Sequence, residues 1–170
     1  MKIIQLVFLL LFATLFMACA VPGLIFSSKD LASRDINSMS NGNKILIASS
    51  QSEYKKALVE KLINHYETKP VYIKITGLSK LSKDIEQTEY DGIVILNQCI
   101  AWNMEKRVKN YLRHTKNHDN LIILTTSGNG SWLPGKKGRK FDALSGASEM
   151  TNLDNKSQEI INKIDKLLVQ

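Results

Sequence analysis

The sequence predicts an α/β domain built on a three-layer open parallel sheet. Short apolar runs at residues 45–48 and 120–126 are typical of strands buried on both faces. Between such runs lie segments with apolar residues at helical spacing, for example residues 54–66. Strands that alternate with helices imply parallel pairing with right-handed crossovers, since each helix returns the chain to the start of the next strand.

The same criteria place the other elements in order. We expect strands at residues 45–48, 71–75, 92–96, 120–126 and 141–144, and helices at residues 54–66, 78–88, 105–114 and 155–169. Ligands of such sheets bind beyond the carboxyl ends of the strands. The loops at residues 49–54, 97–104 and 127–140 are therefore the candidate binding loops.

Residues 1–26 are an apolar segment typical of an export signal or membrane anchor. No charge follows Lys2 as far as Phe26, and a buried core helix would need a polar face. Three outcomes stay open: cleavage after Ala20, lipidation of Cys19 in a stretch that resembles a bacterial lipobox, or an uncleaved membrane span. We expect an exported protein on the periplasmic side of the cell envelope, tethered to the membrane in preference to being secreted.

The remaining chain divides into two parts. Residues 27–43 are polar and rich in Ser and Asn, without a sustained period, so they are expected to form a flexible linker. Residues 44–170 form the folded domain.

Composition and single residues exclude several function classes. The formal net charge is +7, but no basic stripe is interleaved with aromatic residues, so nucleic-acid binding is not expected. His114 and His118 share i,i+4 spacing but have few Asp, Glu or Cys residues near them in the sequence, so no metal site is expected. Cys99 follows the third expected strand without an evident base, and no catalytic residue is assigned. The basic loop at residues 136–140 has no assigned role.

Three stretches resemble flavodoxins. KILIASSQSEYKKALVEKL is similar to their first strand, phosphate loop and first helix. YDGIVILNQCIAWNMEKRVKNYL is similar to their third strand and a flavin-flanking loop, and NLIILTTSGNGSW to the fourth strand and second flanking loop. The resemblance implies a flavodoxin-like fold with strand order 2-1-3-4-5, FMN as cofactor and a redox partner protein.

The resemblance also implies a set of cofactor-binding residues, namely Ser49, Ser50, Ser52, Asn97, Trp102, Thr126, Ser127, Gly128 and Trp132. One position departs from the pattern, because Glu53 stands where a glycine of the phosphate loop is expected. The serines could instead cap the first helix, and the tryptophans could pack over the sheet end. Two functions therefore stay open: an FMN-binding electron-transfer protein, and a cofactor-free binding or interaction module of the cell envelope.

Overall fold

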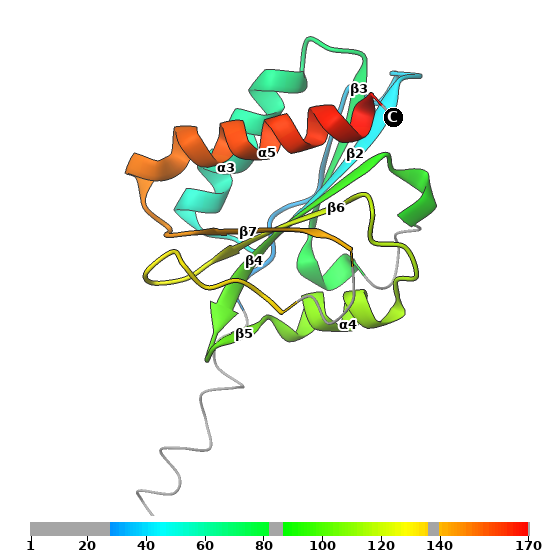
Figure 1. Cartoon of the computed structure of the whole chain (residues 1–170). Helices are drawn as coiled ribbons and strands as arrows, with labels where there is room; N and C mark the ends of the chain where they lie inside the picture. The colour runs from blue at the N-terminus through cyan, green and yellow to red at the C-terminus, as the bar shows by residue number, and fades with distance from the viewer. Residues whose placement is uncertain (1–27, 82–86, 136–139, 170) are drawn as a thin grey trace, which may run out of the picture.

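The centre of the structure is a mostly parallel β-sheet with helices on both faces (Figure 1). The structure, a computed structural model, describes residues 28–81, 87–135 and 140–169. Its strands are β1 (Arg34–Ile36), β2 (Asn43–Ser49), β3 (Val71–Gly77), β4 (Gly92–Ile100), β5 (Asn103–Met104), β6 (Leu121–Thr126) and β7 (Asp142–Gly146). Its helices are α3 (Glu53–Tyr66), α4 (Lys106–His114) and α5 (Leu153–Leu168), with short 3-10 helices η1 (Leu78–Lys80), η2 (Gln87–Glu89) and η3 (Met150–Asn152).

The sheet order is β1-β3-β2-β4-β6-β7, with β5 paired to β4 off this path. The strands from β3 to β7 in this row are parallel, and they follow the predicted order 2-1-3-4-5. Only β1, at one edge, and β5 pair antiparallel within the described residues. The carboxyl ends of β2, β4 and β6 therefore meet at one edge of the sheet, which we call the carboxyl edge.

The strands form because their residues are apolar and largely β-branched, which suits a sheet buried on both faces. In the parallel register, Ile45 lies opposite Ile73 and Ile95 lies opposite Ile123. All four side chains are fully buried. Such pairs fill the central strands and leave little room for slippage.

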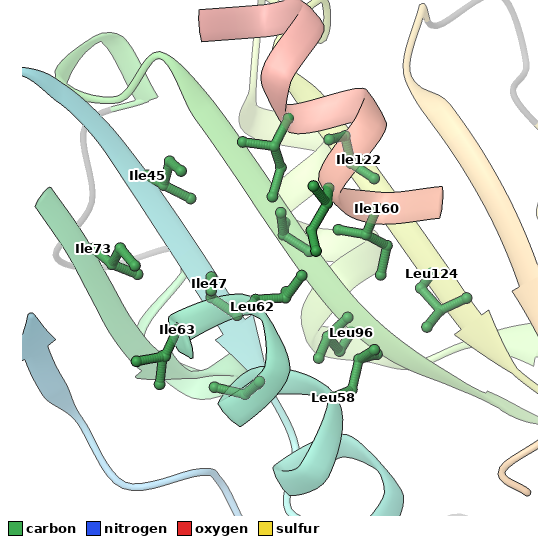
Figure 2. Close-up of a cluster of buried hydrophobic side chains, with 14 of the residues drawn as sticks. Ile45, Ile47, Leu58, Leu62, Ile63, Ile73, Leu96, Ile122, Leu124 and Ile160 are labelled. Carbon is green, nitrogen blue, oxygen red and sulfur yellow. The ribbon is translucent and has the colours of Figure 1, made fainter. Parts of the chain in front are cut away.

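Helices α3 and α5 cover one face of the sheet, and α4 covers the other (Figure 1). Figure 2 shows Leu58 and Leu62 of α3 and Ile160 of α5 over the sheet residues of the first face. On the second face, Val108 and Leu112 of α4 pack against the sheet together with residues of η1. Each helix buries one apolar stripe, as the predicted periodicity requires.

The predicted helices at residues 54–66, 105–114 and 155–169 correspond to α3, α4 and α5. The helix predicted at residues 78–88 is wrong for the described residues, which hold only η1 and η2; residues 82–86 lie outside them. Leu78 and Leu81 are both 1% exposed. Their spacing of three residues suits a single tight 3-10 turn, which buries both side chains without a longer helix.

The linker predicted at residues 27–43 is also corrected. Within it, β1 pairs with β3, and Asn37 donates from Nδ2 to the carbonyls of Glu67 and Val71 at 3.1 Å each. Asn37 adopts a left-handed backbone (φ 54°), which asparagine tolerates well. A three-residue edge strand exposed on one side needs no apolar periodicity, so its polar sequence resembles a linker. The folded domain therefore begins before Lys44.

The predicted export segment, residues 1–26, and the predicted lipidation site Cys19 lie outside the described residues. Among the helices that the structure describes, none is long and apolar enough to span a bilayer.

Candidate functional site

Buried polar side chains line the carboxyl edge where β4 and β6 end. Asn97 donates from Nδ2 to Oγ1 of Thr125 at 3.2 Å, and Oγ1 of Thr126 donates to the Asn97 carbonyl at 3.3 Å. The side-chain oxygen of Asn97 accepts from the backbone N–H of Glu105 at 3.1 Å, just before α4 begins. Asn97 and Thr126 thus join two strand ends to the start of α4, and their bonding groups are engaged inside the protein.

The predicted phosphate loop, residues 49–54, is closed by hydrogen bonds of its own residues. Ser52 caps α3, because its Oγ accepts from the N–H of Lys55 at 3.1 Å and its carbonyl accepts from the N–H of Lys56 at 2.9 Å. Ser49 is fully buried and donates to the Ser50 carbonyl at 2.8 Å. Of the serines, Ser52 thus caps the helix, whereas Ser49 and Ser50 make other hydrogen bonds.

Residues 29–31, which we call the strap, cross the carboxyl edge over this loop. The N–H of Leu31 donates to the Ser49 carbonyl at 3.0 Å, and the N–H of Gln51 donates to the Lys29 carbonyl at 2.6 Å. Asp30 and Ser50 form an antiparallel bridge between these two bonds. The strap therefore engages a backbone donor of the predicted phosphate loop.

Asp30 of the strap belongs to a cluster of four charged side chains. The guanidinium of Arg107 pairs with Asp30 and, at 2.5 Å, with Glu105. The backbone N–H of Ser79 donates to the Asp30 carboxylate at 3.2 Å, and the Ser79 hydroxyl donates to the same oxygen. Lys55 is the fourth charged side chain, and its Nζ donates to Oγ of Ser50 at 2.6 Å. We call Asp30, Lys55, Glu105 and Arg107 the charge cluster.

Lys55 is only 2% exposed. Burial lowers its pKa to about 8, against the opposing attraction of Glu105, and Arg107 lowers the pKa further. Lys55 is not among the predicted site residues, although its position in the sequence indicates that it is buried. Lys55 stands three and seven residues before Leu58 and Leu62, on the buried stripe of α3.

These residues do not fit the phosphate of FMN, the cofactor implied by the resemblance. The Gln51 N–H donates to the Lys29 carbonyl, the Lys55 N–H donates to the Ser52 hydroxyl oxygen, and Glu53 adds a carboxylate in the first turn of α3. The carboxylate of Asp30 already pairs with the guanidinium of Arg107. An incoming phosphate would meet like charge and occupied donors while the strap is docked.

Trp102 lies at the tip of a strained hairpin on the other side of this edge. Strands β4 and β5 pair through Ile100 and Asn103, which leaves Ala101 and Trp102 as a two-residue turn. Both have positive φ, 47° and 59°, as in the type I′ turns that usually take Asn-Gly. The Trp102 side chain is 78% exposed, so the strained backbone presents a large aromatic group to solvent.

Trp132 reaches the same place from the loop after β6. Oγ of Ser127 accepts from the N–H of Trp132 at 3.4 Å, and the N–H of Ser127 donates to the Gly146 carbonyl at 3.0 Å. Gly130 has φ 68°, and a Cβ there would lie 2.5 Å from the backbone nitrogen of Ala147. A tight turn that requires glycine therefore sets the position of the loop.

The two tryptophans line one groove of about 310 Å³, which we call the tryptophan groove. Its other lining residues are Asn103, Met104, Lys109, Leu112, Arg113, Pro134 and Gly135. Lys109 donates to the Asn103 side chain at 2.8 Å, and Arg113 lies one turn further along α4. Within the part of the chain that the structure describes, no ion pair joins either cation to a carboxylate.

The nine predicted site residues thus fall into separate places. Trp102 and Trp132 share the tryptophan groove, whereas Ser49, Ser50 and Ser52 lie at the strap. Ser127 and Gly128 line a shallower cavity of about 280 Å³, together with Gln98, Cys99, Thr126 and residues 147–149. Among the described residues, no cluster of three or more His, Cys, Asp or Glu could hold a metal ion.

No family model and no curated protein sequence matches the chain. Solved structures do match. A flavodoxin from the domain Archaea superposes with a TM-score of 0.50 at 13% identity, over 73% of this chain and 98% of that one. Flavodoxin 1 from Bacillus cereus gives 0.48 at 11% identity, over 74% and 98%. An oxidoreductase from Corynebacterium diphtheriae gives 0.46 at 13% identity, over 76% and 98%. The match to the archaeal flavodoxin and the order of the strands together show that the chain has a divergent flavodoxin-like fold.

Proposed function

We propose that this chain is a cofactor-free interaction module of the cell envelope, held at the membrane by its N-terminal segment. Its binding surface is the tryptophan groove, and its ligand is an acidic segment of a partner protein that carries an apolar side chain. The single observation that carries the proposal is Trp102, which is 78% exposed on a backbone that costs free energy to form.

The charges of the groove favour an anionic ligand. Lys109 and Arg113 line it, and none of its described lining residues carries a carboxylate. Arginine and tryptophan are the residue types most enriched among those that carry binding energy at protein interfaces. Met104 and Leu112 line the groove together with the tryptophans and the cations, so one apolar side chain flanked by acidic residues fits the chemistry of the lining.

An FMN-binding electron carrier is the second candidate. Trp102 and Trp132 favour it, since they stand in the two loops that resemble flavin-flanking loops, and stacking on indole rings suits a planar cofactor. A redox partner protein would then be required. The occupied donors at the strap count against this candidate, which is why we rank it second.

The proposed location rests on the apolar segment at residues 1–26. Fractionation of cells expressing the full chain should place it in the membrane fraction, on the periplasmic side. Palmitate labelling that disappears in Cys19→Ser would assign a lipid anchor. Membrane retention without labelling would assign an uncleaved span. Recovery of a soluble, shortened chain would contradict membrane tethering.

Binding can be measured without a label, because both tryptophans of the sequence line the groove. The full chain in detergent micelles is titrated with a tryptophan-free peptide of Glu and Phe, and with a matched peptide of Lys and Phe. The proposal expects a change in tryptophan emission with the acidic peptide alone. Equal responses to both peptides, or no response to either, would overturn it.

Matched variants test whether the acidic peptide binds at the tryptophan groove. Arg113→Ala should weaken acidic-peptide binding, whereas Lys116→Ala, which removes an exposed cation just beyond α4, should not. The same titration with FMN, followed by visible absorbance and flavin fluorescence, tests the second candidate. Saturable FMN binding by the full chain would favour the electron carrier over the interaction module.

A further inference from the structure

The Asp30 carboxylate is held as a bound oxyanion would be held. One of its oxygens accepts from the guanidinium of Arg107. The other accepts from the backbone N–H and the hydroxyl of Ser79. A guanidinium, a backbone N–H and a hydroxyl together form a donor set that suits a phosphate or carboxylate group. These donors come from α4 and η1, elements distant in sequence from the strap.

The charge cluster balances only while Asp30 is present. Lys55 and Arg107 face the two carboxylates Asp30 and Glu105, and Lys55 and Glu105 are 2% and 4% exposed. Without Asp30 the cluster keeps two cations against one carboxylate. Arg107 then keeps Glu105 as its carboxylate partner, and a bound anion would restore the charge balance of the cluster.

Glycine at the end of β3 makes room for this arrangement. A Cβ at Gly77 would collide with Cβ and Cγ of Asp30. The strap backbone also holds the carboxyl edge through the two bonds of Leu31 and Gln51, and Ser28 just before it bonds to Glu105 and Arg107. Asp30 is therefore the charged attachment of the strap, and its position depends on Gly77.

We propose that the strap is a built-in plug: Asp30 fills an oxyanion site formed by Arg107 and Ser79 beside the buried Ser50–Lys55 pair, and a phosphate group displaces it. While docked, the strap excludes the phosphate of FMN; once released, it admits a phosphate ester. The plug and the tryptophan groove share no residue, so either proposal can fail alone.

The wild-type chain tests this directly. Hydrogen exchange of the Leu31 and Gln51 amides is followed for the full chain in detergent micelles, in inorganic phosphate and in chloride at equal ionic strength. Both amides should exchange faster in phosphate, because both of their bonds belong to the docked strap. The Ile47 amide, in the core of β2, should not change. Equal exchange in the two salts would overturn the plug.

Variants measure how strongly the plug competes. Asp30→Ala and Gly77→Ala should each bind phosphate about tenfold more tightly than wild type, and adding Lys55→Met to Asp30→Ala should remove the gain. Asp35→Ala, which removes an exposed carboxylate from β1, is the matched control. A folded Asp30→Ala or Gly77→Ala that binds no more tightly than wild type would contradict the proposal. If neither variant folds, the wild-type exchange result decides.

A separate comparison of probes identifies the source of the phosphate group. FMN is compared with riboflavin for a soluble ester, and vesicles containing phosphatidic acid are compared with neutral vesicles for a lipid headgroup. Asp30→Ala should bind at least one phosphate-bearing probe more tightly than its phosphate-free counterpart. Equal binding within both pairs would overturn phosphate recognition.

Discussion

The ammonium group of Lys55 donates a 2.6 Å hydrogen bond to the hydroxyl of Ser50, and both side chains are buried at the carboxyl edge. A buried cation beside a buried hydroxyl has an unusual pH dependence, since burial penalises its charged form. This pair provides the first of four predictions.

The free energy of unfolding should rise with pH because of Lys55. Its pKa is lowered from 10.5 to about 8, chiefly by burial, so the unfolded chain binds more protons between these values. The penalty is therefore fully present below about pH 8 and is relieved as the pH rises toward 10.5. Between about pH 7.5 and 9.5 the rise is about 1–2 kcal/mol.

Urea denaturation at the two pH values measures this rise. Lys55→Met should lack it, whereas Lys56→Met, at the neighbouring exposed lysine, should keep it. Parallel pH dependence of wild type and Lys55→Met would contradict the assignment.

Asn37 should hold the edge strand β1 in place. Its Nδ2 donates to carbonyls at the end of α3 and the start of β3, and its backbone is left-handed. Asn37→Ala loses the bonds and strains the backbone, at a cost of about 2 kcal/mol. Asn37→Gly loses only the bonds and should cost less. Hydrogen exchange of the β1 amides measures both changes, and equal exchange in both variants would exclude a backbone contribution.

The strain at the hairpin tip should be measurable at Ala101. A left-handed alanine is costly and glycine is not, so Ala101→Gly should raise the free energy of unfolding by about 0.5–1 kcal/mol. Ala57→Gly, within α3, should lower it by a similar amount. Urea denaturation compares the two variants. A loss of stability in Ala101→Gly would mean that the turn carries no such strain.

Tyr66 should link α3 to α5 through its hydroxyl. The hydroxyl donates to Oδ1 of Asp165 at 2.8 Å, and the ring is 1% exposed. Tyr66→Phe leaves the ring in place and should cost about 1–2 kcal/mol in thermal or urea denaturation. Tyr72→Phe removes an exposed bond to Asp35 and should cost less. Equal costs would show that burial adds nothing to the Tyr66 bond.

The sequence predicts the parallel sheet well, because burial on both faces leaves a direct trace in composition. The run that became β2 is apolar at every position from Ile45 to Ala48, and it can only be a buried strand or part of a buried helix. The helix periodicity of α3 and α5 is equally direct. Strand order follows from a resemblance to flavodoxins, since periodicity does not specify which strands are neighbours.

The candidate site was much less predictable. Asp30 belongs to a polar stretch with no period, and its contacts with Arg107 and Ser79 span 77 and 49 residues. Such contacts depend on tertiary packing that local patterns do not encode. Trp102 was selected by resemblance, but its exposure and left-handed backbone contradict what an alanine-tryptophan pair would prefer locally. Departures of this kind are expected at functional positions.

Residues 28–36, which end in β1, determine how the domain is connected to the anchor proposed at residues 1–26. A flexible linker of the seventeen residues 27–43 would let the domain move about 20 Å from its anchor. Because residues 28–36 are fastened to the sheet, Ser28 stands at the carboxyl edge, where its hydroxyl donates to Glu105 at 3.0 Å. If residues 1–26 anchor the chain in a bilayer as proposed, the chain enters the domain beside the strap and the charge cluster, so any pull on the anchor acts first on the hydrogen bonds of Ser28 and then on Asp30.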